Sequence, residues 1–221
     1  MSHLQLRAAD GHTFSTYLAK PTTAATRGGI VVVQEIFGVT GHIERVADQF
    51  AAQGYLAIAP ALFDRQQRGV NLHYDEAGSK AGCEFAMRAD TAGLMADLAA
   101  SIDAVAHTGA VGMVGYCWGG RVVYMAGSRT HAAAGVVYYG AGITQVLEPV
   151  PRCPMQFHFG RQDAHIPLAD VERIRTAFPQ GEYHLHDAGH GFNCPARSSF
   201  DAAAAHSALE RTLEFFGKYV G

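Results

Sequence analysis

Several features that would assign this 221-residue chain to a specialised class of protein are missing from its sequence. Four cysteines are too few and too scattered to hold a small secreted domain together with disulfides. The 17 basic residues do not exceed the 20 acidic ones, so no cationic surplus exists to neutralise a nucleic-acid backbone. No apolar run approaches the roughly 18 to 20 residues of a membrane span, and residues 1–20 lack the apolar block of a signal peptide. These absences predict a cytoplasmic globular protein without a nucleic-acid or membrane partner.

What the sequence does contain is a sustained alternation of short apolar runs with longer helical stretches. Runs that suit buried strands of a parallel sheet fall at 28–33, 55–59, 110–116, 134–139, 155–159 and 183–186. Helical periodicity is found at 41–53, 88–105, 168–177 and 202–219. The runs 4–6 and 13–18 flank the turn dipeptide Asp10-Gly11 and predict an antiparallel hairpin at the edge of the sheet.

This alternation extends over nearly the whole chain, and no repeat, low-complexity tract or linker interrupts it. We therefore expect one doubly wound α/β domain over residues 1–221. The one long polar segment, 64–80, is predicted to run over the surface of that domain.

The most informative segment is 111–120, where an apolar run leads into Gly-x-Cys-x-Gly and then into a helix expected to begin near Arg121. Small residues at Gly115 and Gly119 permit the sharp strand-to-helix turn that lifts a nucleophile above the carboxyl edge of a sheet. The nucleophile here is Cys117, and the N-terminus of the helix is expected to lower the pKa of its thiol. The backbone N–H of Trp118 would face the oxyanion formed after attack.

An acid and a histidine follow the cysteine in the chain order typical of folds that carry this turn. Asp163 comes directly after the run 155–159, and His190 comes soon after the run 183–186. Both positions lie at carboxyl ends of predicted strands, where α/β sheets place their ligand sites. We expect His190 to transfer protons to and from the cysteine, the leaving group or water, and Asp163 to fix the tautomer of the imidazole.

The 12 histidines raise the alternative of a metal site. The sequence contains neither H-E-x-x-H nor a pair of C-x-x-C motifs, and His184 and His186 have no obvious third ligand beside them. We therefore predict no metal and no cofactor.

Four motifs, at 34–38, 115–120, 160–163 and 189–192, resemble those of the dienelactone hydrolase family of α/β-hydrolases, and the resemblance covers essentially the whole chain. It implies an α/β-hydrolase fold and hydrolysis of an ester or lactone, of the carboxymethylenebutenolidase type, through a Cys-His-Asp triad and a cysteinyl acyl-enzyme. It also implies that Glu35 contacts the resting thiol and accepts its proton when substrate binds. The N–H of Ile36 would be the second oxyanion donor, and Phe37 would contact the substrate.

The sequence departs from the family where the best-characterised members bind a substrate carboxylate with two arginines. The first of these positions holds Cys194, with Arg197 three residues further on. The second falls on Ser79, with Lys80 adjacent and Arg88 nearby. Arg197, Lys80 and Arg88 are therefore the candidate anchors for a carboxylate on the substrate.

The remaining pocket positions also differ. Two aromatic positions of the family fall on Cys83 and Ala86, and both Cys83 and Cys194 are expected near the pocket. The pair Tyr138 and Tyr139 resembles a family motif near the site, and either tyrosine could contact substrate or simply pack.

Three alternatives stay open beside hydrolysis of a dienelactone-like substrate. The same triad could serve a carboxylesterase or acyltransferase of another acyl substrate, or a thiol peptidase. Because the pocket lining has changed, the chain could also be a catalytically silent protein that binds a small molecule or senses oxidants through its thiol. The expected partner is a small ester or lactone, which could carry a carboxylate, and the expected assembly is a monomer or a small homo-oligomer.

Overall fold

The structure, a computed structural model, describes residues 2–22 and 26–221. Its strands are β1 Ser2–Arg7, β2 Thr13–Ala19, β3 Gly29–Val33, β4 Leu56–Pro60, β5 Val111–Tyr116, β6 Ala134–Tyr138, β7 Met155–Gly160 and β8 Glu182–His186. Its α-helices are α1 Gly41–Ala52, α2 Glu76–Arg88, α3 Thr91–Val105, α4 Trp118–Arg129, α5 Leu168–Ala177 and α6 Ala202–Tyr219. Two short 3-10 helices lie at Ala106–Thr108 and Ile143–Gln145.

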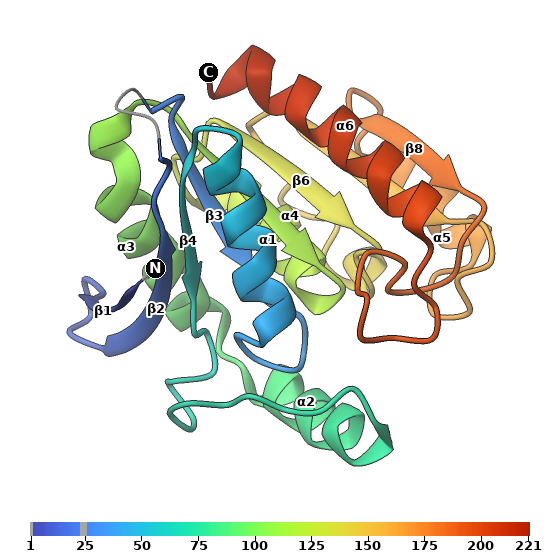
Figure 1. The fold of residues 1–221 in the computed structure, drawn as a ribbon. Coiled ribbons are helices and arrows are strands. Elements are labelled where there is room, and N and C mark those ends of the chain that lie inside the picture. Colours follow the sequence, from blue (N-terminus) through green and yellow to red (C-terminus); the bar gives the residue numbers. More distant parts are fainter. Residues whose placement is uncertain (1, 23–25) are drawn as a thin grey trace.

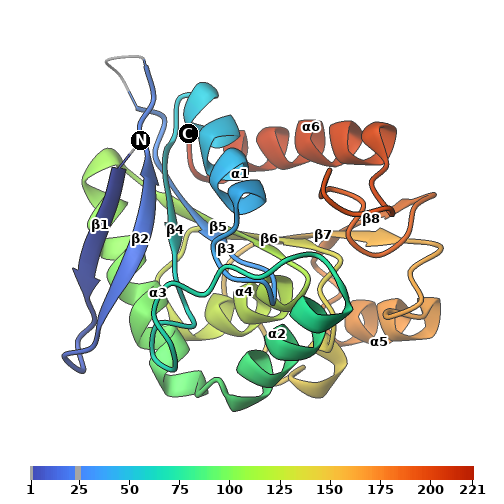
Figure 2. The same cartoon turned by 60° about the horizontal axis from the view of Figure 1, so that its bottom comes forward.

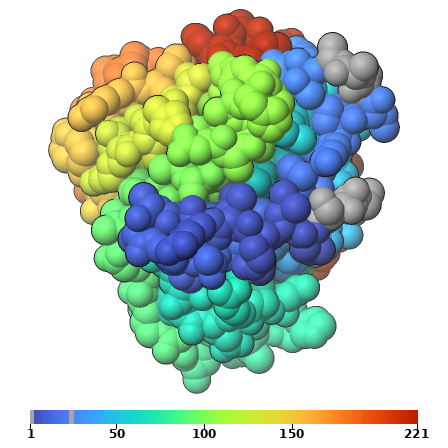
Figure 3. All heavy atoms as spheres, turned by 90° about the vertical axis from the view of Figure 1, so that its left-hand side faces the viewer, coloured from blue at the N-terminus to red at the C-terminus, as the bar shows by residue number. Residues whose placement is uncertain are grey.

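All of these strands belong to one twisted sheet in the order β1-β2-β4-β3-β5-β6-β7-β8 (Figure 1). Strands β4, β3 and β5 to β8 run parallel, whereas β2 is antiparallel to both β1 and β4. This arrangement confirms the predicted mostly parallel sheet with an antiparallel N-terminal edge. Figure 3 shows that edge from outside, with the N-terminal residues spread across the surface of the molecule.

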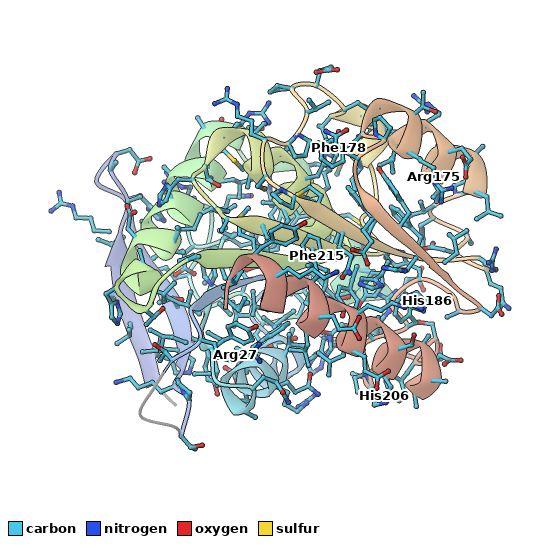
Figure 4. The ribbon with its side chains drawn as sticks, turned by 90° about the horizontal axis from the view of Figure 1, so that it is seen from above. Arg27, Arg175, Phe178, His186, His206 and Phe215 are labelled. Atoms are coloured by element: carbon cyan, nitrogen blue, oxygen red, sulfur yellow. The ribbon has the colours of Figure 1, made fainter. Side chains whose placement is uncertain are left out.

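Helices cover both faces of the sheet, which is why its central strands carry apolar residues without alternation. Helices α1 and α6 lie on one face, and α3, α4 and α5 lie on the other (Figure 2). Every residue of β3, β4, β5, β6 and β7 is buried. Figure 4 looks down on α6, from which Phe215 packs into the core.

The prediction for the segment before α3 was wrong in its boundaries. A single helix was expected over 88–105, with a surface segment over 64–80, but the chain forms two helices, α2 and α3. They separate at Ala89 and Asp90, and the Asp90 carboxylate caps α3 by accepting a hydrogen bond of 2.7 Å from the N–H of Gly93. Hydrophobic periodicity did not indicate α2, because two of the three buried residues of this helix are glycines, at positions 78 and 82. Phe85 is the one large apolar residue on its buried face.

The register of the parallel strands brings their carboxyl ends to one edge of the sheet. Val33 of β3 pairs with Gly115 of β5, and Tyr116 at the end of β5 pairs with Tyr138 of β6. Gly160 at the end of β7 pairs with His186 at the end of β8. The loops that follow these strands therefore converge above this edge. Among the described residues, no helix has the length and apolar character needed to span a membrane.

Candidate active site

Cys117 occupies a sharp turn between β5 and α4. Its backbone has φ 55° and ψ −120°, a conformation that L-residues rarely adopt. The turn closes because Gly115 and Gly119 approach each other. A Cβ placed on Gly115 would lie 2.2 Å from the carbonyl oxygen of Gly119, so no larger residue fits. Helix α4 begins at Trp118, three residues earlier than predicted, which places Cys117 directly at the helix N-terminus.

Cys117, His190 and Asp163 form a continuous chain of contacts. Nε2 of His190 lies 3.1 Å from Sγ of Cys117, and Nδ1 of the same ring lies 2.8 Å from Oδ2 of Asp163. All three side chains are buried. The other carboxylate oxygen of Asp163 accepts a hydrogen bond of 2.8 Å from the N–H of His165, and this bond fixes the orientation of the carboxylate. The Asp163 contact places the Nδ1 proton toward the carboxylate and leaves Nε2 free to accept the thiol proton.

The helix N-terminus acts on the pKa of the Cys117 thiol in the expected direction, through the N–H of Trp118, but two stronger influences outweigh it. Burial, reinforced by the negative charge of Glu35, raises the pKa of the thiol to about 12, although the N–H of Trp118 acts in the opposite direction. Burial also lowers the pKa of His190, against the opposing effect of Asp163. The resting pair is therefore a neutral thiol beside a neutral imidazole.

Glu35 lies on the loop that follows β3 and is completely buried. Burial raises the pKa of its carboxyl to about 7, while the charge of Arg197 acts against this rise. The distance from Nη1 of Arg197 to Oε1 of Glu35 is 3.8 Å. The loop itself is held by Gln34, whose Oε1 accepts a hydrogen bond of 3.0 Å from the N–H of Leu62. The resemblance implied that Glu35 contacts the resting thiol, but among the described residues neither of its carboxylate oxygens has a hydrogen-bond partner, and it acts on the Cys117 thiol through its charge.

A cavity of about 600 Å³ opens beside the sulfur of Cys117. Its volume suits a small organic molecule. Its lining combines apolar side chains with a few convergent polar ones: Ile36, Phe37, Ser79, Cys83, Ala86, Met87, Ala89, Cys117, Trp118, Arg121, Ala141, Gln145, His165, His190 and Arg197. The two predicted oxyanion residues, Ile36 and Trp118, and the predicted substrate contact Phe37 therefore meet around the sulfur.

Of the three predicted carboxylate anchors, only Arg197 lines this cavity. Lys80 and Arg88 are exposed on α2, and the guanidinium of Arg88 lies 5.4 Å from the centre of the Phe85 ring. Arg121, which was not among the predicted anchors, also lines the cavity, and its buried Nε has no hydrogen-bond partner among the described residues. Its position four residues after Cys117 could have revealed it, because residues i and i+4 share one face of a helix.

The structure places Tyr138 in the core and not at the cavity. Its hydroxyl lies 2.8 Å from Oγ1 of Thr212 on α6. The prediction that Tyr138 could contact the substrate is therefore wrong, and Tyr138 packs in the core. Tyr139 lies closer to the site, with its ring edge against His190 at a centroid distance of 5.2 Å.

The two cysteines expected near the pocket have different positions. Cys83 is exposed and lines the cavity, whereas Cys194 is completely buried. The ligand atoms of Cys194, Glu35 and His42 all lie within 4.8 Å of one another. No spacing motif in the sequence indicates this cluster, because its members come from two loops and a helix that are far apart in the chain.

Comparison with known proteins gives one consistent result. The sequence model of the dienelactone hydrolase family matches residues 14–220. A carboxymethylenebutenolidase of Pseudomonas putida is 33% identical over 223 residues, which cover 96% of this chain and 94% of that protein. A putative carboxymethylenebutenolidase of Synechocystis is 34% identical, with 90% of this chain and 89% of that protein covered.

Comparison with solved structures gives the same result as comparison with these relatives. The crystal structure of a putative dienelactone hydrolase from Klebsiella pneumoniae superposes with a TM-score of 0.85 at 27% identity, over 99% of this chain and 100% of that one. An esterase of Pyrococcus furiosus, at 14% identity and a TM-score of 0.68, shares the fold alone. The predicted α/β-hydrolase fold is thereby confirmed.

Proposed function

The chain belongs to the dienelactone hydrolase family and is a hydrolase of carboxylic esters or lactones, and we propose that it acts through a cysteinyl acyl-enzyme formed on Cys117. One observation carries this proposal. The 3.1 Å contact from His190 to the sulfur continues through the 2.8 Å contact to Asp163, and the sulfur borders a cavity of about 600 Å³. A nucleophile, its base and the orienting acid thus meet where a substrate carbonyl can reach them.

In the first half of the proposed reaction, the sulfur attacks the carbonyl carbon. The thiol proton passes to Nε2 of His190, the S–C bond forms, and the carbonyl oxygen gains the negative charge. The N–H groups of Ile36 and Trp118 would stabilise this oxyanion, a contribution of about 3 kcal/mol for each donor. When the C–O bond breaks, the imidazolium donates its proton to the leaving oxygen.

In the second half, water attacks the thioester carbonyl while His190 accepts a proton from that water. Collapse of the intermediate breaks the S–C bond, and the proton returns from His190 to the thiolate. The acid product leaves, and the resting neutral pair is restored. The high thiol pKa described above fits this cycle, because a sulfur that stays protonated between turnovers is a poor target for oxidants.

The proposal predicts that Cys117→Ala lowers kcat/KM for an activated aryl ester by at least about 1,000-fold, because the variant has no nucleophile. Cys153→Ala is the matched control, since the Cys153 sulfur lies beside Met155, away from the cavity, and should keep wild-type turnover. Mass spectrometry of rapidly quenched wild-type reactions should show the acyl group on Cys117. Comparable turnover by Cys117→Ala and Cys153→Ala would discard the assignment.

We further propose that the preferred substrate carries a carboxylate held by Arg197 and Arg121, the two cationic side chains of the cavity. Arg121→Met should raise KM about 10- to 100-fold for an ester bearing a free carboxylate, which is the loss of a charged hydrogen bond, with little change for the methylated analogue. Arg88→Met is the control, because Arg88 lies outside the cavity. Equal effects of Arg121→Met on both esters would contradict this substrate class.

A further inference from the structure

Behind the cavity, the side chains of Glu35, His42 and Cys194 form a compact cluster of three different donors. Glu35 follows β3, His42 lies in the first turn of α1, and Cys194 lies on the loop between β8 and α6. Their carboxylate, imidazole and thiol ligand atoms all lie within 4.8 Å of one another. The exposed fractions of the three residues are 0%, 4% and 0%. Neither His42 nor Cys194 has a role in the proposed hydrolysis.

Three polar atoms of this cluster have no hydrogen-bond partner within 3.5 Å, although the nearby hydroxyl of Tyr74 influences both Glu35 and Cys194. Among the described residues, neither carboxylate oxygen of Glu35 has a hydrogen-bond partner, and neither has Nε2 of His42. Nη1 of Arg197 lies 3.8 Å from Oε1 of Glu35, so Arg197 contributes a positive charge near the carboxylate but no hydrogen bond. Buried polar atoms without partners are rare, because each costs about 1 to 3 kcal/mol in lost hydration. Here they are the two oxygens of one carboxylate and a ring nitrogen, in residues whose ligand atoms lie within 4.8 Å of one another, and they indicate a ligand that accepts their lone pairs.

We propose that Glu35, His42 and Cys194 form a binding site for a divalent transition-metal ion of the zinc class. Thiolate, imidazole and carboxylate are the three ligand types that zinc binds in proteins, and three protein ligands leave the fourth tetrahedral position open. Magnesium and calcium are excluded by the mixed sulfur and nitrogen donors, since both prefer all-oxygen sites. This proposal replaces the expectation of a metal-free chain, and it does not depend on the mechanism of hydrolysis.

The geometry requires only a small adjustment. Bonds of about 2.0 to 2.3 Å to a tetrahedral ion place the ligand atoms about 3.5 Å apart. The donors, now within 4.8 Å of one another, therefore need to approach by about 1 Å, which side-chain rotation can supply.

The cluster also has a route to solvent. A second cavity, of about 300 Å³, lies between α1 and α6 and is lined in part by His42, Asn193, Pro195 and His206. Asn193 and Pro195 flank Cys194 in the chain, and His206 lies on the N-terminal half of α6 (Figure 4). An ion could thus reach the imidazole of His42 without passing through the substrate cavity. A site that takes up its metal from solution needs such an entry path.

Cobalt(II) titration tests the site directly, because a thiolate bound to cobalt gives a charge-transfer absorption band. Protein first treated with a chelator should bind one cobalt ion per chain with this band, and added zinc should abolish it. The band should be absent from Cys194→Ser, and His42→Gln should bind cobalt more than about 10-fold more weakly, since even outer-sphere changes cost this much. Cys117→Ser and Cys153→Ser should both retain the band.

Three results would overturn the proposal. They are the absence of a charge-transfer band in wild-type protein, its persistence in Cys194→Ser, and its loss in Cys117→Ser, which would assign the ion to the nucleophile instead. The first result does not depend on whether any variant folds. Because Cys117→Ala, which has no nucleophile, is expected to bind the ion without hydrolysing ester, failure of the metal site and failure of the proposed hydrolysis are separate outcomes.

Discussion

The sulfur of Cys117 is subject to two opposing influences from residues on either side of it. The N–H of Trp118, at the start of α4, favours the thiolate, whereas burial and the charge of Glu35 favour the thiol. Burial and Glu35 prevail, since the pKa of Cys117 is raised to about 12. Part of this rise is electrostatic, and that part disappears when the charge on residue 35 is removed.

Glu35→Gln should therefore increase the reactivity of Cys117 toward iodoacetamide. Removing a nearby negative charge lowers the thiol pKa, and each unit of decrease gives about tenfold more thiolate at pH 8. We expect about 10-fold faster alkylation of the Cys117 peptide, measured by mass spectrometry in the presence of a chelator, with exposed Cys83 as the internal reference. Glu172→Gln removes an exposed acid on α5 and should change nothing. An unchanged or slower rate in Glu35→Gln would show that Glu35 does not control the thiol.

At the scale of elements, α2 forms one wall of the substrate cavity through a close approach of backbones. A Cβ added to Gly82 would lie 2.3 Å from the carbonyl oxygen of Ile36, on the loop that carries a proposed oxyanion donor. Backbone atoms cannot move aside as a flexible side chain can, so a larger residue has to displace either the helix or the loop.

Gly82→Ala should consequently lower kcat/KM about 10- to 100-fold. A loss of this size is expected when the oxyanion loop is displaced by a fraction of an ångström to about 1 Å. Gly217→Ala, in α6, provides the matched control. Its added Cβ would meet only the guanidinium of Arg27, at 3.5 Å. That variant should keep full activity and gain about 0.5 to 1 kcal/mol in the free energy of unfolding, measured by urea denaturation. Full activity in Gly82→Ala would mean that α2 does not position the oxyanion loop.

The difference between α2 and β5 explains what could be predicted from the sequence. Strand β5 and the turn at Cys117 were predictable because the local chemistry is restrictive: an apolar run, two glycines and a nucleophile permit few conformations. Helix α2 has few large apolar residues, and its position depends on contacts with Ile36 that only the folded chain creates. For the same reason Arg197 could be proposed from the sequence, whereas the cluster of Glu35, His42 and Cys194 could not.

At the scale of the whole molecule, buried histidines connect the sheet to helix α6. His158 on β7 and His186 on β8 lie 3.1 Å apart through Nδ1 and Nε2, and Nε2 of His158 lies 2.9 Å from Oε1 of Gln156. Because Gln156 can only accept through Oε1, His158 donates from Nε2 and accepts at Nδ1 from the neutral ring of His186. A proton added to Nδ1 of His158 would therefore break the hydrogen bond between the two rings. Burial lowers the pKa of His158, and it lowers that of His186 to about 4.

The free energy of unfolding should therefore fall as the pH decreases below about 6.5. In that range the unfolded chain binds protons at both histidines, while the folded chain does not, so acid favours unfolding. Each histidine should account for a loss of about 2 kcal/mol between pH 7 and pH 5, and the pair for about 4 kcal/mol, measured by urea denaturation. His186→Gln should show a smaller loss between the two pH values, because it removes one of the two protons, whereas His131→Gln, at an exposed position, should match the wild type. If all three proteins lose the same free energy, the buried histidines do not determine the acid sensitivity of the fold.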